Sequence, residues 1–216
     1  MSSDNTATLD RPSTGRPRER PDSGVRRAAP ADAGALSRTL ASAFHDDPVF
    51  GWCIPDPRQR DRFLAPWFQV VVDALVAHGE TYCAPGVVGA ALWVPPGATT
   101  LSEDEGDRLG AVTSEIGGVT PGRSEALARI MEAGHPHDPH LYLNFAGVRV
   151  ADQGQGWGGR LLRSRLARAD EHGVPAYLEA TSERNRALYE RHGFEVTGKL
   201  SVDGSPPLWQ MWRDPR

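Results

Sequence analysis

Glycine dominates one short segment in the second half of the chain, Gln153-Gly154-Gln155-Gly156-Trp157-Gly158-Gly159. An apolar run precedes it and helical apolar spacing follows, so we expect a strand, a tight turn and a helix. Glycine allows left-handed backbone angles and lets an anion approach peptide N–H groups. A helix N-terminus adds unpaired N–H donors and a partial positive charge. The segment therefore predicts a phosphate-binding loop, and a turn kept only for helix packing is the structural alternative.

Two kinds of phosphate ligand are open for this loop. Gly154, Gly156 and Gly159 match the G-x-G-x-x-G dinucleotide fingerprint, and Glu179 follows where a ribose-binding acid is expected. That fingerprint normally opens a series of βαβ units, whereas only a short segment follows Glu179. A Walker loop is excluded because its G-x-x-x-x-G-K-[ST] pattern does not occur. A nicotinamide cofactor is thus the minor alternative.

A histidine-rich segment and two cysteines are the other candidates for chemistry. Residues 135–140 read His-Pro-His-Asp-Pro-His. Prolines favour an exposed loop over the rigid geometry that a metal needs, so we expect no metal site; an acceptor-side loop and a solvated linker both remain open. Cys53 and Cys83 lack a nearby base motif, which argues against a covalent nucleophile, and two lone cysteines make no disulfide framework.

Alternating helices and strands must position these residues. Helices are predicted at 32–44, 57–78, 156–172 and 182–192, with a polar helical region at 101–133 broken by two glycine-containing turns. Strands are predicted at 25–29, 80–84, 87–94, 140–150, 175–180, 194–202 and 208–213. Pro85-Gly86 between two of these strands predicts an antiparallel hairpin. The pattern indicates an α+β (mixed α/β) fold.

Length and charge limit the class of protein. The chain has 216 residues, with 28 Asp and Glu against 24 Lys and Arg, a net charge of −4. No apolar run reaches the ~18–20 residues that a membrane span needs, and no broad basic surface is indicated, so we expect neither a membrane nor a nucleic-acid partner. Residues 1–24 are poor in apolar side chains and predict a disordered tail. We expect one domain at 25–216, in a soluble, cytoplasmic protein.

Residues 153–158 also match [QR]-x-x-G-x-[GA], the coenzyme A pyrophosphate loop of the GCN5-related N-acetyltransferase (GNAT) superfamily. Asn185, Tyr189 and Gly193-Phe194 then follow in the order and at spacing similar to that superfamily. The resemblance covers about residues 25–213 and implies a central, mostly antiparallel, twisted sheet with flanking helices. Segments 43–48, 152–156, 173–179 and 189–194 resemble the puromycin N-acetyltransferases and related small-molecule acetyltransferases, except that those enzymes carry a tyrosine where Asp47 stands.

The resemblance implies acetyl-CoA as co-substrate, without a metal. The carrier-binding residues that it implies are Val148, Arg149, Val150, Gln153, Gly154, Gln155, Gly156, Trp157, Gly158, Gly159 and Asn185. Of these, Val148 and Val150 would present backbone groups to the pantetheine arm, and the amide of Val148 would polarise the acetyl carbonyl. The loop amides would hold the pyrophosphate, with Gln153 where many relatives have arginine.

Tyr189 is the predicted general acid, because a phenol with a pKa near 10 can protonate a departing thiolate; packing beneath Phe194 is its structural alternative. Glu179 is the candidate carboxylate for the amine's proton, although it could instead pair with an arginine. Asp46 and Asp47, at a break after the first predicted helix, are candidate acceptor contacts together with Trp52 and Trp93.

The sequence predicts an acetyl-CoA-dependent N-acetyltransferase that acts by direct transfer on the amine of a small molecule. An aminonucleoside-type antibiotic is the acceptor suggested by resemblance, and antibiotic resistance would then be the biological role. A protein-amine acetyltransferase and a non-catalytic coenzyme A-binding module are the alternatives. Monomer and homodimer are both open.

Overall fold

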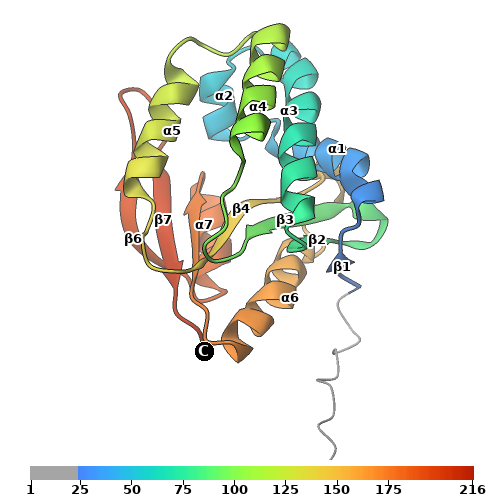
Figure 1. Cartoon of the computed structure of the whole chain (residues 1–216), viewed down its shortest axis with the longest axis vertical. Coiled ribbons are helices and arrows are strands. Elements are labelled where there is room, and N and C mark those ends of the chain that lie inside the picture. Colours follow the sequence, from blue (N-terminus) through green and yellow to red (C-terminus); the bar gives the residue numbers. More distant parts are fainter. Residues whose placement is uncertain (1–23) are drawn as a thin grey trace, which may run out of the picture.

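The computed structural model describes residues 24–216, so the predicted tail at 1–24 lies almost entirely outside the described residues. The strands there are β1 (Arg26–Arg27), β2 (Thr81–Cys83), β3 (Gly89–Val94), β4 (Leu141–Val148), β5 (Ala176–Ala180), β6 (Glu195–Leu200) and β7 (Leu208–Arg213). They form one sheet in the order β1-β2-β3-β4-β5-β7-β6. Only β4 and β5 are parallel neighbours in it. The predicted mostly antiparallel α+β sheet is therefore confirmed (Figure 1).

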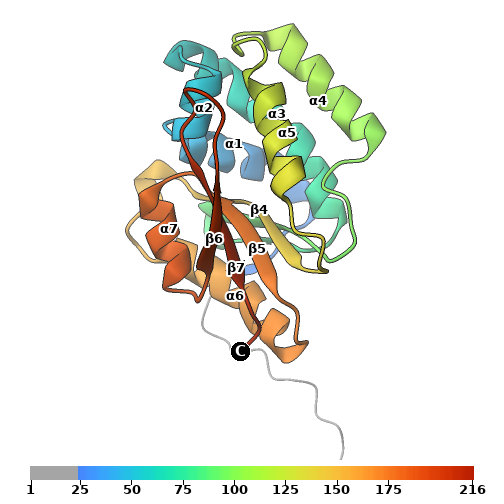
Figure 2. The same ribbon diagram turned by 90° about the vertical axis from the view of Figure 1, so that its left-hand side faces the viewer.

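Helices cover both faces of this sheet (Figure 2). Their bounds are α1 (Ala33–Phe44), α2 (Pro48–Cys53), α3 (Pro57–Ala77), α4 (Glu103–Ile116), α5 (Arg123–Gly134), α6 (Trp157–Glu171) and α7 (Glu183–Glu190). Helices α1 to α5 pack with one hydrophobic core, which includes Phe68, Leu92 and Tyr177. Helices α6 and α7 pack with a second core on the opposite face, around Trp93 and Leu178. The sheet thus separates two cores, and each of its faces can carry different chemistry.

Local signals explain most of these bounds. The Asp56 carboxylate accepts a hydrogen bond from the Arg58 N–H at the start of α3, and Ser102 with Glu105 forms a reciprocal cap at the start of α4. The predicted break in the polar helical region separates α4 from α5. The hairpin predicted at Pro85-Gly86 is present between β2 and β3.

Two predicted boundaries were wrong. Helix α2 was missed, because Asp47-Pro48 starts a new helix: the Asp47 side chain caps it and Pro48 takes the first helical position. The strand predicted at 140–150 ends at Val148, and Val150 lies in a 3₁₀ turn with 60% of its surface exposed. Val150 therefore cannot extend the edge of β4 as expected.

Glycine permits the close approach of α1 to β4. A Cβ atom at Gly147 would lie 2.7 Å from the Cβ of Ala43, which is closer than real Cβ atoms come to other atoms. Helix α1 therefore rests directly on the strand that borders the glycine loop. This contact places the turn after α1, with Asp46 and Asp47, near the end of β4.

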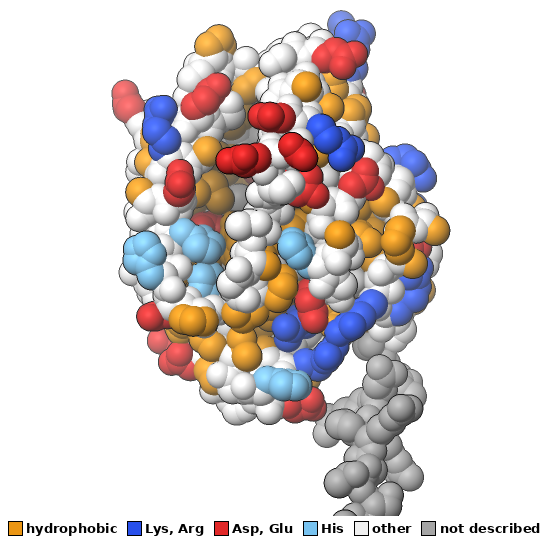
Figure 3. Space-filling model, viewed as in Figure 1, with side chains coloured by type: hydrophobic (Ala, Val, Ile, Leu, Met, Phe, Trp, Pro, Cys, Tyr) orange, Lys and Arg blue, Asp and Glu red, His pale blue; other side chains and the backbone are white. Residues whose placement is uncertain are grey.

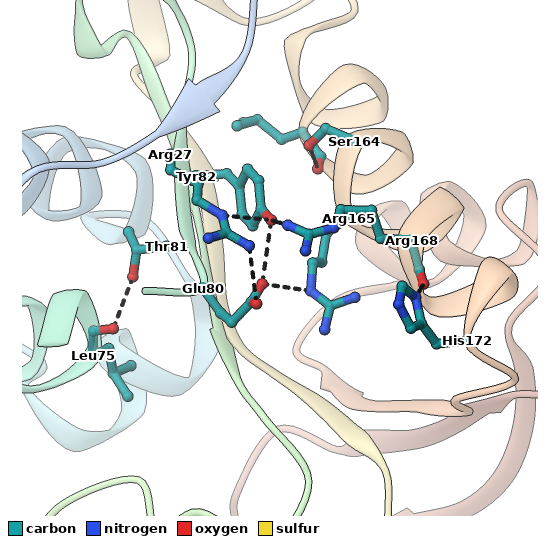
Figure 4. A network of polar contacts seen from close by, with 10 residues as sticks. Arg27, Leu75, Glu80, Thr81, Tyr82, Ser164, Arg165, Arg168 and His172 are labelled. Carbon is teal, nitrogen blue, oxygen red and sulfur yellow. Dashed lines mark hydrogen bonds and ion pairs between the residues drawn. The ribbon is translucent and has the colours of Figure 1, made fainter. Parts of the chain in front are cut away.

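A polar network fixes α6 against β1 and β2 (Figure 4). The Arg165 Nε atom lies 2.7 Å from a carboxylate oxygen of Glu80, with both side chains mostly buried. Arg168 donates a hydrogen bond to the Tyr82 hydroxyl at 3.2 Å, and Arg27 contacts both Tyr82 and Glu80. Because α6 begins at the glycine loop, this network also orients that loop.

In the described part of the chain, 24–216, no helix combines the length and apolar character that a membrane crossing requires.

Candidate active site

Strands β4 and β5 pair over only two residue positions. Leu141 pairs with Ala176 and Tyr142 with Tyr177, and no further pair joins them within the described residues. Strand β5 stays paired with β7 as far as Ala180, whereas β4 continues to Val148 alongside β3. The β4 edge from residue 143 onward therefore has no strand partner on the β5 side. Such an edge offers N–H and C=O groups to an extended ligand, as in strand addition.

A β-bulge marks the start of this opening. Leu92 pairs with Phe145 and Trp93 with Leu143, which leaves Asn144 without a partner in the ladder. The Asn144 Oδ1 atom is buried and accepts no hydrogen bond within residues 24–216. A buried polar atom without a partner is costly, and ligand binding is one way to satisfy it.

The glycine loop lies beyond the end of β4 and has the geometry of an anion site. Gly154 and Gly156 have φ values of +78° and +81°, and the space where each Cβ would stand is open. Gly156 precedes α6 without a side-chain cap, so the first N–H groups of α6 have no partner from a preceding turn. Free amides, a helix dipole and open space fit a pyrophosphate.

Side chains around the loop hold its shape. Gln153 donates a hydrogen bond from Nε2 to the Val148 carbonyl at 3.0 Å. The guanidinium of Arg149 pairs with Asp152, with 2.6 Å between Nε and Oδ2. Arg160 stacks over the Trp157 ring, 4.7 Å from its centroid. Gln153, Arg149 and Trp157 therefore have structural partners, and Gln155 together with the backbone of the glycines faces outward for a ligand.

The loop, the unpaired edge and the orphaned Asn144 oxygen fit the carrier that the sequence predicts. A pantetheine arm carries amides that suit an unpaired strand edge, and its pyrophosphate suits the start of α6. The two features are continuous along β4 and its following turn, as one elongated ligand requires.

Tyr189 on α7 is buried, with 7% of its surface exposed. Its ring packs on Phe194 at 6.0 Å between centroids, and its hydroxyl has no hydrogen bond within the described residues. Burial raises the pKa of Tyr189 well above 10, and the nearby Asp47 carboxylate raises it further. The phenol is therefore protonated at neutral pH, as a proton donor must be.

A short chain of hydrogen bonds joins the acceptor side to α7. The Thr181 hydroxyl donates to the Asp47 carboxylate at 2.5 Å, and Asn185 donates from Nδ2 to Thr181 Oγ1 at 3.5 Å. The same Asp47 carboxylate accepts the Val49 and Phe50 N–H groups of α2. Three predicted site residues, Asp47, Asn185 and Tyr189, thus lie in one neighbourhood, where Asp47 also has a structural role as the cap of α2.

Glu179 lies on the other face of β5. Leu178 and Ala180 belong to the core that contains Tyr189, whereas Tyr177 belongs to the opposite core. Because strand side chains alternate, Glu179 shares the face of Tyr177. It stands two residues beyond the last β4–β5 pair, at the start of the opening. Its side chain is 4% exposed, and its Oε1 atom has no hydrogen bond within the described residues.

Aromatic and histidine side chains surround Glu179. The Tyr142 and Tyr177 rings lie 5.9 Å apart, and burial followed by the Glu179 charge raises the pKa of both phenols above 10. The His135 Nδ1 atom lies 3.9 Å from Glu179 Oε1. No arginine pairs with Glu179 among residues 24–216, which removes the structural alternative considered for it.

The sequence did not reveal how the histidine segment packs. His140 is buried, with 8% of its surface exposed, against the expectation of an exposed loop. His135 packs its ring against His140, Tyr142 and Tyr177 at 4.8–5.1 Å. One feature of the sequence could have predicted that His140 is buried: it lies one residue before an apolar strand. No group of three or more metal-ligating side chains is present in the part described.

Two cavities lie on the α1–α5 side of the sheet. One, of about 560 Å³, is lined by residues 94–98, Thr100, 135–140 and Tyr142. Figure 3 shows histidine side chains gathered on this face. The other, of about 370 Å³, is lined by Ala41, Ser42, His45, Asp46, Arg60, Asp61, Leu64 and Val150. Both have the size of small-molecule pockets.

The predicted acceptor contacts are divided by their positions. Asp46 is 86% exposed, pairs with His45 at 2.8 Å and lines the smaller cavity. Trp52 is half-buried beneath the guanidinium of Arg123, 4.8 Å from its ring centroid. Trp93 has no exposed surface and lies in the α6-side core, so its assignment as an acceptor contact is corrected to a core residue. Cys53 is buried, which raises its thiol pKa to about 11 and keeps it a poor nucleophile.

Known proteins are similar to this chain in sequence and in fold. Residues 87–194 match the model described as the acetyltransferase (GNAT) family. The chain is 25% identical to an uncharacterized N-acetyltransferase of Schizosaccharomyces pombe over 210 residues, 88% of this chain and 83% of that protein. It is 28% identical to a Corynebacterium glutamicum structure described as histone acetyltransferase HPA2 and related acetyltransferase, with a TM-score of 0.67 over 89% of this chain and 96% of the other. Drosophila melanogaster polyamine N-acetyltransferase is similar in fold, at 15% identity, a TM-score of 0.54 and coverage of 88% and 98%.

Proposed function

The chain belongs to the acetyltransferase (GNAT) family and is an N-acetyltransferase, and from this premise we propose that it moves an acetyl group from acetyl-CoA to the amine of a small molecule by direct transfer. The opening between β4 and β5 is the observation that carries the proposal. It has an anion-binding loop at its end, a buried carboxylate on one side and a buried, protonated tyrosine on the other.

The two faces of the sheet divide the proton chemistry of the reaction. When bound, acetyl-CoA supplies the acetyl group as a thioester. Glu179 accepts a proton from the ammonium of the acceptor, because only a neutral amine has a free electron pair for attack. Tyr189 donates its hydroxyl proton towards the sulfur that leaves. A C–N bond forms and a C–S bond breaks. Glu179 takes up one proton from the ammonium, and Tyr189 gives one proton to the sulfur and regains one when the nitrogen loses its second proton as the amide forms.

Other residues bind and orient. The amides of the glycine loop and the start of α6 bind the pyrophosphate, and the unpaired β4 edge binds the arm of the carrier. Asn185 lies at the start of α7 and donates a hydrogen bond to Thr181, the residue that follows β5. The order of these groups along β4, the loop and α7 supports their assignment to one ligand.

A small acceptor is supported by the size of the cavities and by the charge near them. Volumes of about 560 and 370 Å³ suit molecules of modest size. Glu179 is buried and carries no paired cation, so it favours a positively charged amine. Among small amines, we propose an aminonucleoside as the acceptor, on the resemblance of the sequence. One position differs: Asp47 stands where the enzymes that acetylate such antibiotics carry tyrosine, and here its side chain caps α2.

The experiment has two parts. First, thermal unfolding is followed with acetyl-CoA, and separately with NAD and NADP; at 100 times Kd a ligand adds about 2.7 kcal/mol to stability, a rise of several degrees in Tm. Second, free thiol is measured with agmatine, tryptamine, puromycin and a lysine-containing peptide as acceptors.

A rise in Tm with acetyl-CoA alone, together with thiol release by a small amine, is the expected result. Release with the peptide alone would replace this proposal by a protein-amine acetyltransferase, the class named for the C. glutamicum relative. Stabilisation without thiol release for any acceptor would indicate a binding module, and stabilisation by NAD would mean that the loop takes a dinucleotide.

A further inference from the structure

We propose that His135 carries the proton of the acceptor amine from Glu179 to the 560 Å³ cavity, and that His140 fixes the tautomer of His135 that allows this. The inference rests on the proposed function, in which Glu179 receives that proton. It concerns a step that the site leaves open, namely how a buried carboxylate returns to its charged form between turnovers.

Burial isolates Glu179 from solvent. Its side chain is 4% exposed, whereas the His135 side chain is 36% exposed and lines the cavity. The two side chains face each other, with 3.9 Å between Nδ1 and Oε1. His135 is therefore a group that touches both the carboxylate and the solvent-accessible cavity.

Hydrogen-bond partners determine the tautomer of each ring. The His140 Nδ1 atom lies 2.7 Å from the Asp138 carbonyl oxygen, which can only accept, so Nδ1 carries a proton. Burial lowers the pKa of His140, which leaves the ring neutral and its Nε2 atom an acceptor. The His135 Nε2 atom lies 3.2 Å from that acceptor and must donate to it. In neutral His135 the free electron pair is then on Nδ1, the atom that faces Glu179.

Two acceptors consequently face each other across the 3.9 Å gap. Glu179 Oε1 receives no hydrogen bond within the described residues, and neutral His135 offers it none. That distance exceeds a direct hydrogen bond and fits one bridging water or a proton taken up by either group. Neither Glu179 Oε1 nor Nδ1 of neutral His135 receives a hydrogen bond from the other, so the pair can take up one proton. One proton is what the amine must lose to Glu179 before it attacks.

An N–H bond of the ammonium breaks and an O–H bond forms on Glu179. That O–H bond breaks as an N–H bond forms at Nδ1 of His135, directly or through one water. The imidazolium then gives its Nδ1 proton to water from the cavity and returns to the neutral form with a proton on Nε2, which His140 accepts. No electron is transferred, and one proton leaves per turnover.

Four side chains surround the His135 ring. They are Tyr142 on β4, Tyr177 and Glu179 on β5, and His140 before β4. Glu179 is the one carboxylate in contact with the ring among the described residues.

Two measurements test the inference. In the first, histidine ring nitrogens of the free protein are observed by ¹⁵N NMR at neutral pH. We expect His140 protonated at Nδ1 and His135 protonated at Nε2. Glu179→Gln should change the His135 signals and leave His140 protonated at Nδ1, because the Asp138 carbonyl still accepts that proton. The opposite tautomer on His135 would overturn the inference, whatever the activity of the enzyme.

In the second measurement, turnover is followed by thiol release with agmatine, or with the best acceptor of the panel above. His135→Ala should lower kcat on the order of 10²-fold at unchanged Kd for acetyl-CoA. Added imidazole, which can enter the open cavity, should restore part of the rate. His137→Ala is the matched control, because His137 is exposed on the same segment and lines the same cavity.

Normal turnover of His135→Ala in an active enzyme would overturn the relay and leave the proposed function intact. A low rate that imidazole does not restore would assign His135 a structural role and likewise overturn the relay. A wild-type enzyme that binds acetyl-CoA but acetylates no amine would overturn the proposed function and this inference together.

Discussion

Tyr189 combines burial with a neighbouring carboxylate, and both keep its phenol protonated. Since the pKa lies well above 10, loss of the phenolic proton should not limit activity between pH 7 and pH 10. A decline in that range would have to come from another group. This behaviour suits a group that donates a proton to a thiolate in each turnover.

Removing the Tyr189 hydroxyl tests this role. Tyr189→Phe should lower kcat by about 10²- to 10⁴-fold, the range for a lost general acid, while Kd for acetyl-CoA stays the same. Stability should hardly change, because the hydroxyl makes no hydrogen bond within the described residues. Rates come from thiol release and Tm from thermal unfolding. Tyr82→Phe is the contrasting control: it removes hydrogen bonds with Arg168 and Glu80, so it should lower Tm and spare kcat. Near-wild-type turnover of Tyr189→Phe would remove Tyr189 from the mechanism.

Asp47 makes stability depend on pH in an unusual direction. Burial raises its pKa above the ordinary 3.8, and its three hydrogen bonds only partly oppose this. The folded state therefore holds the Asp47 proton more tightly than the unfolded state. Its contribution to stability is complete at low pH and is lost as the pH rises through the folded pKa.

Asp47→Asn isolates this contribution, since an amide oxygen can still cap α2 without carrying a charge. We expect the two proteins to have similar Tm values near pH 3. As the pH rises to 7, the Tm of the variant should increase relative to that of the wild type. Thermal unfolding at a series of pH values measures this difference. If the Tm of the variant instead falls relative to wild type as the pH rises, the charged carboxylate stabilises the fold.

Among the elements, the turn between β4 and α6 has the most demanding backbone. Gly156 needs a φ of +81°, which a β-branched residue adopts only with strain, and its open side faces the proposed pyrophosphate. The start of α6 depends on this conformation to present its N–H groups outward.

Gly156→Val should abolish the increase in Tm that acetyl-CoA gives, while the fold without ligand survives. Gly106→Ala is the matched control: it lies within α4 with no atom within 4 Å of its Cβ position, and it should bind normally. The free energy of unfolding of that control should also rise by up to about 1 kcal/mol, because alanine favours a helix over glycine by that amount. Unchanged acetyl-CoA binding in Gly156→Val would contradict the assignment of the loop.

Elements with strong periodic patterns were predictable, and short or interrupted ones were not. The apolar stripe of α3 gave its range to within a residue, and Pro85-Gly86 gave the β2–β3 hairpin. Helix α2 has six residues, which are too few to show a helical spacing of apolar side chains. Only the Asp47-Pro48 start could have indicated it. The bulge at Asn144 depends on how β3 and β4 align, which no single strand encodes.

For the whole molecule, the Glu80 network is the contact that ties the glycine loop to the rest of the fold. Glu80 lies among three arginines and a tyrosine contributed by β1, β2 and α6 (Figure 4). Residues that are distant in sequence thus set the orientation of α6.

Glu80→Gln should destabilise the protein by about 2–3 kcal/mol, because mostly buried arginine charges lose their counter-ion. Thermal unfolding should show a Tm lower by several degrees. Glu171→Gln, exposed on the same α6, is the control and should change Tm by less than about a degree. Equal stability of Glu80→Gln and wild type would mean that packing alone holds α6.

The sequence by itself determined the fold class, most of the element ranges and the glycine loop, because these depend on local periodicity and on backbone freedom. It also placed Tyr189 and Asn185 on one helix, at a spacing that the structure keeps. Tertiary structure decided which residues share a site. Trp93 lies in the core because alternation along β3 places it, with Ala91, on the face that α6 covers. Glu179 and Tyr189 face opposite sides of the sheet because strand alternation and helix packing put them there. His135 reaches Glu179 only when the segment that follows α5 folds against β5, a contact between positions more than forty residues apart that no local pattern contains.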